Sequence, residues 1–237
     1  MAKTQSPDKA FAALARRVVA CRQCPRLVDH RENVQTTKTR RFADQDYWGK
    51  PLPAFGDPRA RLLIVGLAPA AHGANRTGRM FTGDRSGDWL FETLHRFGFA
   101  TQSESTDRAD GLELNDCCIT AVARCAPPGN KPTAHEIETC RGYMVRELDI
   151  LDDVRVVVAL GKIAFDGFQA AWRDSGLAIP KPKPKFGHGS VATLEGRARE
   201  VLLLGSYHPS QQNTFTGRLT APMFHQVFRK ARQALNQ

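Results

Sequence analysis

The chain has 237 residues, of which 41% are hydrophobic and 24% are charged, and its formal net charge is +10. This composition supports a buried core and excludes a disordered chain, and no apolar run approaches the ~20 residues that a membrane-spanning helix requires. The positive charge favours a polyanionic partner, nucleic acid first, over the alternative of a protein that is merely basic throughout. The first residues are polar and lack the apolar segment of a secretory signal, so we expect a cytoplasmic protein without membrane contact.

Apolar periodicity predicts an alternation of helices and strands along the chain. A helix is expected after Ser6-Pro7, where an N-cap precedes proline at the first helical position. No period holds between Val28 and Pro58, which predicts an extended segment. The later elements are, in order, a strand at 62–67, a helix at 86–97, a strand at 117–123, a helix at 133–151 that opens with a capping box, a strand at 154–160, a helix from 161, an edge strand at 189–194, a strand at 201–205 and a helix at 221–235.

This order of elements predicts the fold class. Short apolar strands that alternate with helices are typical of a parallel sheet covered on both faces. We therefore expect an α/β fold with a central four-stranded parallel sheet flanked by helices on both faces. The sequence has no internal repeat and no second hydrophobic core, so residues 1–237 are predicted to form a single domain. Residues 1–58 supply its N-terminal helix and extended segment in this prediction.

The loop from Gly66 to Asp84 is the most informative stretch, because ligands of parallel α/β sheets bind outside the carboxyl ends of the strands. It has the outline of a Walker A loop. However, Arg79 and Met80 stand where that motif needs lysine and a magnesium-binding hydroxyl, which strongly disfavours a nucleotide triphosphatase. What remains is a set of main-chain N–H groups, the ring of Phe81 and the carboxylate of Asp84. Taken alone, the ring fits a core residue equally well, and the carboxylate fits a helix cap.

Six cysteines in a chain without a signal peptide point away from a disulfide framework. One C-x-x-C pair and two later cysteines can form a set of four thiolates: Cys21, Cys24, Cys125 and Cys140. Such a set can hold zinc or a [4Fe–4S] cluster, and independent buried cysteines are the alternative. The remaining two, Cys117 and Cys118, are adjacent within a predicted strand, so we expect both in the core.

Two stretches resemble the motifs of a known family. Residues 66–84, Gly-Leu-Ala-Pro-Ala-Ala-His-Gly-Ala-Asn-Arg-Thr-Gly-Arg-Met-Phe-Thr-Gly-Asp, resemble the first motif of the family 5 (type B) uracil-DNA glycosylases. His208-Pro-Ser, followed by Gln212-Asn-Thr, resembles their second motif. The four cysteines match the [4Fe–4S] set that families 4 and 5 share. The resemblance covers roughly residues 10–235 and implies the α/β fold of that superfamily. It also implies a cluster that ties the N-terminal segment to the region after the second strand.

The family implies a monofunctional DNA repair hydrolase. It flips a deaminated or damaged base out of DNA and cleaves the N-glycosidic bond, which leaves an abasic site. The resemblance implies that Phe81 stacks on the flipped base. It assigns catalysis to Asp84, which faces the oxocarbenium-like sugar and orients the attacking water, and to His208, which donates to a carbonyl oxygen of the base. Further substrate contacts are expected from Leu67, Ala68, Ala71 and Asn130. DNA contacts are expected from Ser210, Asn213 and Arg218.

One departure from the family 4 pattern bears on specificity. Family 4 enzymes read uracil with an asparagine at the end of the second strand, in an Ile-Thr-Asn pattern, whereas Ile119-Thr120 is followed here by Ala121. The nearest candidate reader is Asn130, in a stretch that resembles the family 5 pattern, and its side-chain amide fits the donor–acceptor edge of uracil. Without the strand asparagine we expect a less strict pocket. The family 5 resemblance also implies broad specificity, with uracil, hypoxanthine, ethenocytosine and mispaired thymine as substrates.

Double-stranded DNA is the expected partner, single-stranded DNA is left open, and a monomer is expected. Two other functions fit the same residues. One is a non-catalytic iron–sulfur protein that binds nucleic acid, which would need neither Asp84 nor His208. The other is a zinc-stabilised α/β enzyme that acts on a small anionic substrate. If the family reading holds, the loop at 211–218 enters the minor groove. Three of its residues are candidates to fill the gap that the flipped base leaves: Asn213, Phe215 and Arg218.

Overall fold

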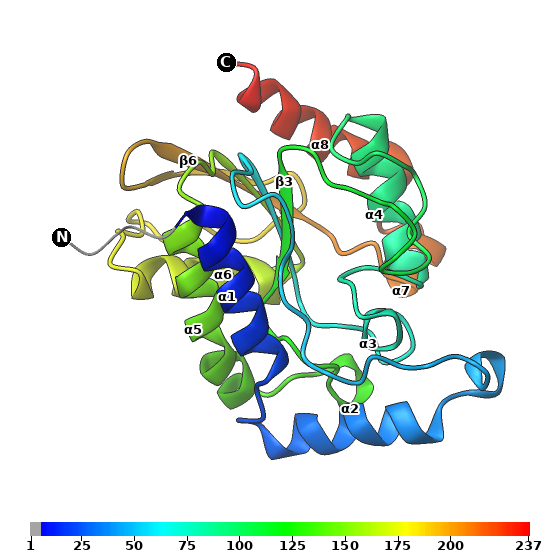
Figure 1. Ribbon diagram of the computed structural model, residues 1–237. Helices are drawn as coiled ribbons and strands as arrows, with labels where there is room; N and C mark the ends of the chain where they lie inside the picture. The colour runs from blue at the N-terminus through cyan, green and yellow to red at the C-terminus, as the bar shows by residue number, and fades with distance from the viewer. Residues whose placement is uncertain (1–5) are drawn as a thin grey trace.

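The computed structural model describes residues 6–237 and places one sheet between two layers of helices (Figure 1). The strands are β1 Phe55–Gly56, β2 Leu62–Gly66, β3 Cys117–Ala121, β4 Val156–Leu160, β5 Val191–Glu195 and β6 Glu200–Ser206. Their order in the sheet is β1-β3-β2-β4-β6-β5. The four inner strands run parallel, whereas β1 and β5 pair antiparallel at the two edges. The predicted α/β fold with a parallel four-stranded centre is therefore confirmed, but the whole sheet has six strands rather than four.

Helices cover both faces of this sheet (Figure 1). They are α1 Pro7–Val19, α2 Pro25–Thr37, α3 Ala74–Thr77, α4 Arg85–Arg96, α5 Ala134–Ile150, α6 Lys162–Asp174, α7 Gln211–Phe215 and α8 Ala221–Leu235, with short 3-10 turns η1 Arg40–Phe42 and η2 Pro128–Asn130. Helices α4 and α8 pack together on one face, and α1, α5 and α6 pack on the other. In the part of the chain that the structure describes, no helix combines the length and apolarity needed to cross a membrane.

The strands β2, β3 and β4 are buried along their whole length, as apolar strands covered on both faces should be. Cys117 and Cys118 show the alternation of side chains across β3. The first packs into the core beneath α4 and α8, the second into the core beneath α5 and α6, and neither is exposed. The prediction that both are core residues is confirmed.

Helix α2 corrects the prediction of an extended segment after Val28. Its buried face carries Leu27, Arg31 and Val34 at helical spacing, and the Arg31 side chain is only 2% exposed. A buried guanidinium in the middle of this face interrupts the apolar period from which a helix is read. The prediction was therefore wrong for 28–37. The edge strand β1 was also missed, because two residues carry no periodic signal.

Candidate active site

A cleft of about 650 Å³ lies at the carboxyl ends of the parallel strands. Its walls come from the loop after β2, the turn after β3, the segment after β6 and the start of α4. Most of the predicted substrate and catalytic residues line it: Leu67, Ala68, Phe81, Asp84, Asn130 and His208, with Ser210 at the edge. Ala71 does not line the cleft. Segments that lie far apart in the sequence thus meet at one edge of the sheet, as the strand order requires.

Phe81 stands in the wall of this cleft with its ring stacked on that of His208. The ring centroids are 5.8 Å apart and the planes are inclined by 27°. The backbone of Phe81 has φ of 55°, a left-handed conformation that is rare for a bulky residue. Glycines make room for it. A Cβ on Gly66 would lie 2.9 Å from the Phe81 ring, and a Cβ on Gly87 would overlap its carbonyl oxygen. The ring therefore packs against the core and also faces the cleft.

Asp84 has two oxygens in two different environments. Oδ1 accepts hydrogen bonds from the main-chain N–H groups of Ser86, at 2.9 Å, and Gly87, at 3.1 Å, so the residue is the N-cap of α4. The alternative interpretation of Asp84 as a helix cap is therefore correct, but the cap uses only Oδ1 of the carboxylate. Oδ2 lies against Gly73 and accepts no hydrogen bond within residues 6–237. Burial raises the pKa of Asp84, against the opposing effect of the two N–H donors.

His208 follows strand β6 and is held in place through its main chain. Its carbonyl accepts a hydrogen bond of 2.9 Å from Nδ2 of Asn213. Ser210 is the N-cap of α7 and accepts from the Asn213 N–H at 3.4 Å. Two of the three predicted DNA contacts therefore also brace the loop that carries the histidine. The third, Arg218, is exposed and stacks over the ring of Tyr207 at 4.6 Å.

His208 is expected to stay neutral at physiological pH. Burial lowers its pKa to about 4, from an ordinary value of 6.5. The unfolded chain binds this proton near 6.5, so acidification from about 6.5 to 4 favours unfolding. Ring ¹⁵N–¹H correlation spectra between pH 3.5 and 8 should show the His208 resonances titrating near 4, with His208→Gln used to assign them. A midpoint near 6.5 would contradict this expectation.

The main-chain N–H groups of Leu67 and Ala68 provide a second set of donors at the cleft. Within residues 6–237, neither N–H donates to another main-chain group, although the Leu67 carbonyl accepts from Ala123 at 3.0 Å. Pro69 follows and has no N–H. Such an arrangement is suited to a carbonyl oxygen or a developing anion.

Arg79, at the position of the Walker lysine, anchors the loop from inside. Its Nη1 and Nη2 donate to the two oxygens of Asp110 at 2.9 and 2.6 Å, and Nη2 also donates to Ser105 at 2.6 Å. The side chain is 5% exposed. This buried ion pair clamps the segment with Phe81 and Asp84 onto the loop at 101–112. The arginine is therefore structural, in line with the rejection of a phosphate-binding role.

Three further residues at the cleft were missed in the sequence or left among alternatives. Arg85 and Lys131 line its mouth and bring positive charge next to the catalytic candidates. Phe215 on α7 is 66% exposed, and the Arg85 guanidinium lies over its ring at 4.4 Å. Arg85 directly follows Asp84, and Lys131 directly follows Asn130. This adjacency to predicted site residues was the only sign in the sequence that the two cations belong to the cleft. The pairing of Arg85 with Phe215 carried no such signal, because 130 residues separate them.

The four predicted cysteine ligands line a single cavity. Cys21 and Cys24 reach it from the segment between α1 and α2, Cys125 from the end of β3, and Cys140 from α5. The main-chain N–H of Arg124 donates to Sγ of Cys140 at 3.4 Å. Within residues 6–237, no three histidine, cysteine or acidic side chains are close enough to bind one metal ion. The four cysteines thus line one cavity without forming a close group of three metal-binding side chains in that part of the chain.

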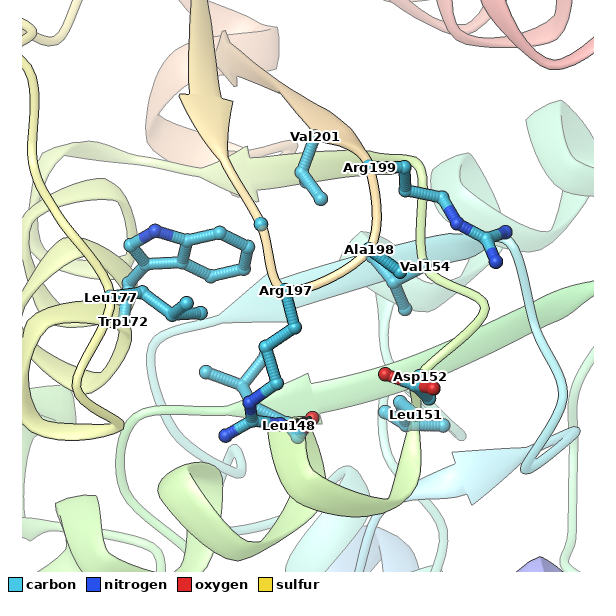
Figure 2. A pocket seen from close by; sticks show the side chains of 11 residues that line it. Leu148, Leu151, Asp152, Val154, Trp172, Leu177, Arg197, Ala198, Arg199 and Val201 are labelled. Atoms are coloured by element: carbon cyan, nitrogen blue, oxygen red, sulfur yellow. Dashed lines mark hydrogen bonds between the residues drawn. The ribbon is translucent and has the colours of Figure 1, made fainter.

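A smaller hollow lies at the opposite end of the sheet, beneath the turn that joins β5 to β6 (Figure 2). Its volume of about 30 Å³ corresponds to about one water molecule. Leu148, Trp172 and Val201 form apolar walls, and Arg197 spans it to donate to the Leu148 carbonyl at 3.2 Å. The hollow is too small for a base or a sugar.

Comparison with known proteins shows the family of the chain. The family model of the uracil DNA glycosylase superfamily matches residues 53–235. The chain therefore belongs to the uracil-DNA glycosylase superfamily. The type-5 uracil-DNA glycosylase of Mycobacterium bovis is 55% identical over 217 residues, which cover 91% of this chain and 78% of that protein. Those of Thermus thermophilus and Pyrobaculum aerophilum are 47% and 41% identical, over 93% and 98% of this chain and 96% of each relative. Within the superfamily, the chain is a member of the type-5 family.

Proposed function

We propose that this protein removes uracil from DNA by hydrolysing the N-glycosidic bond, which leaves an abasic site. The observation that carries the proposal is the convergence of three groups at one cleft. The Phe81 ring, the free Oδ2 of Asp84 and the neutral imidazole of His208 meet at the ends of two parallel strands. The cleft admits a nucleotide only after it leaves the stack, so the base must be flipped.

Each group has a separate part in bond cleavage. The flipped base stacks on Phe81, and its carbonyl oxygens face the N–H groups at Leu67 and Ala68 and the imidazole of His208. As the bond breaks, negative charge develops on the base, and each fixed donor to it contributes about 2.7–4 kcal/mol. The sugar becomes cationic at the same time. The unpartnered oxygen of Asp84 stabilises that charge and orients the attacking water, while the other oxygen holds the carboxylate on α4.

The proposed substrates also include hypoxanthine, ethenocytosine and mispaired thymine. Ala121 lines the cleft where a stricter pocket has an asparagine, so its side chain neither donates to a base nor excludes one. Asn130 is exposed, has a left-handed φ of 56° and lies on the turn η2. An amide on an exposed turn can meet bases of different shape. A base-release panel in defined pairs tests this breadth, and activity on uracil alone would contradict it.

Phe215 is the proposed residue that fills the gap left by the flipped base. Asn213 is hydrogen-bonded to His208, and the exposed Arg218 lies over Tyr207, away from the residues that line the cleft. The Phe215 ring is 66% exposed and lies against Arg85, which lines the cleft. Phe215→Ala is expected to lower kcat/KM on a G·U duplex by about 5–150-fold, because stacking of one base on a ring contributes about 1–3 kcal/mol. Single-turnover rates should fall less on single-stranded DNA, where no gap needs filling. Phe215→Tyr is the control. Equal losses on both substrates would contradict the assignment.

The proposed cofactor is a [4Fe–4S] cluster held by Cys21, Cys24, Cys125 and Cys140. The support is that the four sulfurs line one cavity without the close spacing of a single-ion site. A tetrahedral zinc site would draw all four sulfurs to about 2.3 Å from one centre. When bound, the cluster supplies a structural link between the start of α2 and the region after β3. Iron and sulfide analysis and a visible spectrum test this, since a zinc-bound protein is colourless.

The decisive experiment for the activity uses a duplex with one G·U pair. Incubation with the protein, followed by alkali, should cut the strand at the former uracil and leave a G·C duplex intact. A folded protein that binds the G·U duplex without base release would overturn the proposal. That outcome would favour the non-catalytic nucleic-acid-binding alternative.

A further inference from the structure

Two buried arginines lie beside the four-cysteine cavity. Arg124 lines the cavity, precedes the ligand Cys125 and is 1% exposed. Arg31 is 2% exposed and lies one helical turn beyond Leu27 and Val28, two residues of α2 that line the same cavity. One buried guanidinium on α2 and another after β3 thus lie next to the cavity.

Their hydrogen bonds are incomplete. Nη2 of Arg124 donates to Glu147 at 2.6 Å, but its Nε and Nη1 are buried without a partner in residues 6–237. Arg31 donates through Nη1 to the Gly49 carbonyl, and its Nε is likewise buried without a partner. Buried donors are almost always satisfied, so three unused guanidinium nitrogens call for an acceptor.

Their charge is also incompletely balanced. Glu147 is 1% exposed and neutralises one of the two guanidinium groups. The carboxylate near Arg31 belongs to Glu32, which is 38% exposed and is shared with Arg22. One buried positive charge is therefore left over on the protein side. An isolated buried charge is unfavourable, which points to an anionic group in the neighbouring cavity.

We propose that Arg31 and Arg124 compensate the negative charge of the iron–sulfur cluster, retain it in its cavity and raise its reduction potential. This rests on the proposed cofactor. Four thiolates and an oxidised core sum to two negative charges, and one electron from an external reductant adds a third. Fixed positive charges and N–H donors stabilise the more negative form more strongly. The two arginines are positioning residues for the cluster and are remote from the bond that is cleaved.

The test compares reduction potentials in the loaded protein, measured by mediated titration with the visible absorbance as readout. Arg31→Met should lower the potential, and Arg31→Lys should largely restore it. The double variant Arg124→Met, Glu147→Gln should have a lower reduction potential than Glu147→Gln alone. Glu147 is replaced in both proteins so that no buried carboxylate is left without a partner. Arg16→Met is the matched control, because it removes the same charge from an exposed position on α1 and should leave the potential unchanged.

A chelator provides the second readout. Arg31→Met and the double variant should lose iron several-fold faster than Arg16→Met. Unchanged potentials together with unchanged iron loss would overturn the proposal. Zinc or no iron in the wild-type protein would overturn the cofactor itself. Neither result bears on base release, which the G·U duplex assay measures separately.

Discussion

Asp84→Asn is expected to lower the rate of uracil release by about 10²–10⁴-fold, the range for a positioned acid–base group. Asparagine is as good an N-cap as aspartate, so the bonds from the N–H groups of Ser86 and Gly87 and the stability of α4 should be retained. What is lost is the negative charge at Oδ2, which stabilises the cationic sugar in the proposed mechanism. The measurement is a single-turnover rate on a G·U duplex, paired with a thermal unfolding curve.

Two comparisons separate the charge of Asp84 from its cap. Asp84→Ala removes both and should add a loss of about 0.5–2 kcal/mol in the free energy of unfolding. Asp88→Asn, one turn further along α4 and exposed, should keep the wild-type rate. Burial raises the Asp84 pKa above 3.8, so the wild-type rate should fall with acid at a higher pH than an ordinary carboxyl would give. A wild-type rate in Asp84→Asn would mean that the carboxylate only caps α4.

His208→Ala is expected to lower kcat by about 10²–10³-fold, equivalent to about 2.7–4 kcal/mol of transition-state stabilisation. The loss should fall on kcat more than on KM, because charge on the base develops only as the bond breaks. The neutral imidazole needs no proton from solvent to act, since one ring nitrogen carries a hydrogen at pH 7. Single-turnover and steady-state rates on the same duplex measure the split.

Two replacements distinguish the donor of His208 from its ring. His208→Phe keeps an aromatic ring against Phe81 but has no N–H, so it should be as slow as His208→Ala. His208→Gln keeps a donor and should recover part of the rate. If His208→Phe were active and His208→Gln were not, stacking rather than hydrogen bonding would be the contribution of this residue.

Much of the fold followed from local patterns. The apolar runs that became β2, β3 and β4 are buried on both faces, so their composition alone marks them as inner strands. The capping box at Thr133 and Glu136 marked the start of α5, and both of its hydrogen bonds are present. Helix α2 could not be predicted in this way, because Arg31 occupies its buried face and is stabilised by contacts distant in sequence.

The site divides in the same manner. The sequence determines the residue types of the site through two short motifs and the order of the strands. These residue types are an aromatic ring, a carboxylate and an imidazole that follow the ends of strands. Only the tertiary structure decided that Asp84 uses one oxygen as a cap and leaves the other free. It also decided that Phe215 lies beneath Arg85, and that two buried arginines next to the cysteine cavity keep unused donors. Periodicity and motifs are local properties of a chain, whereas a free oxygen, an exposed ring and an uncompensated charge are defined by which distant groups fail to reach them.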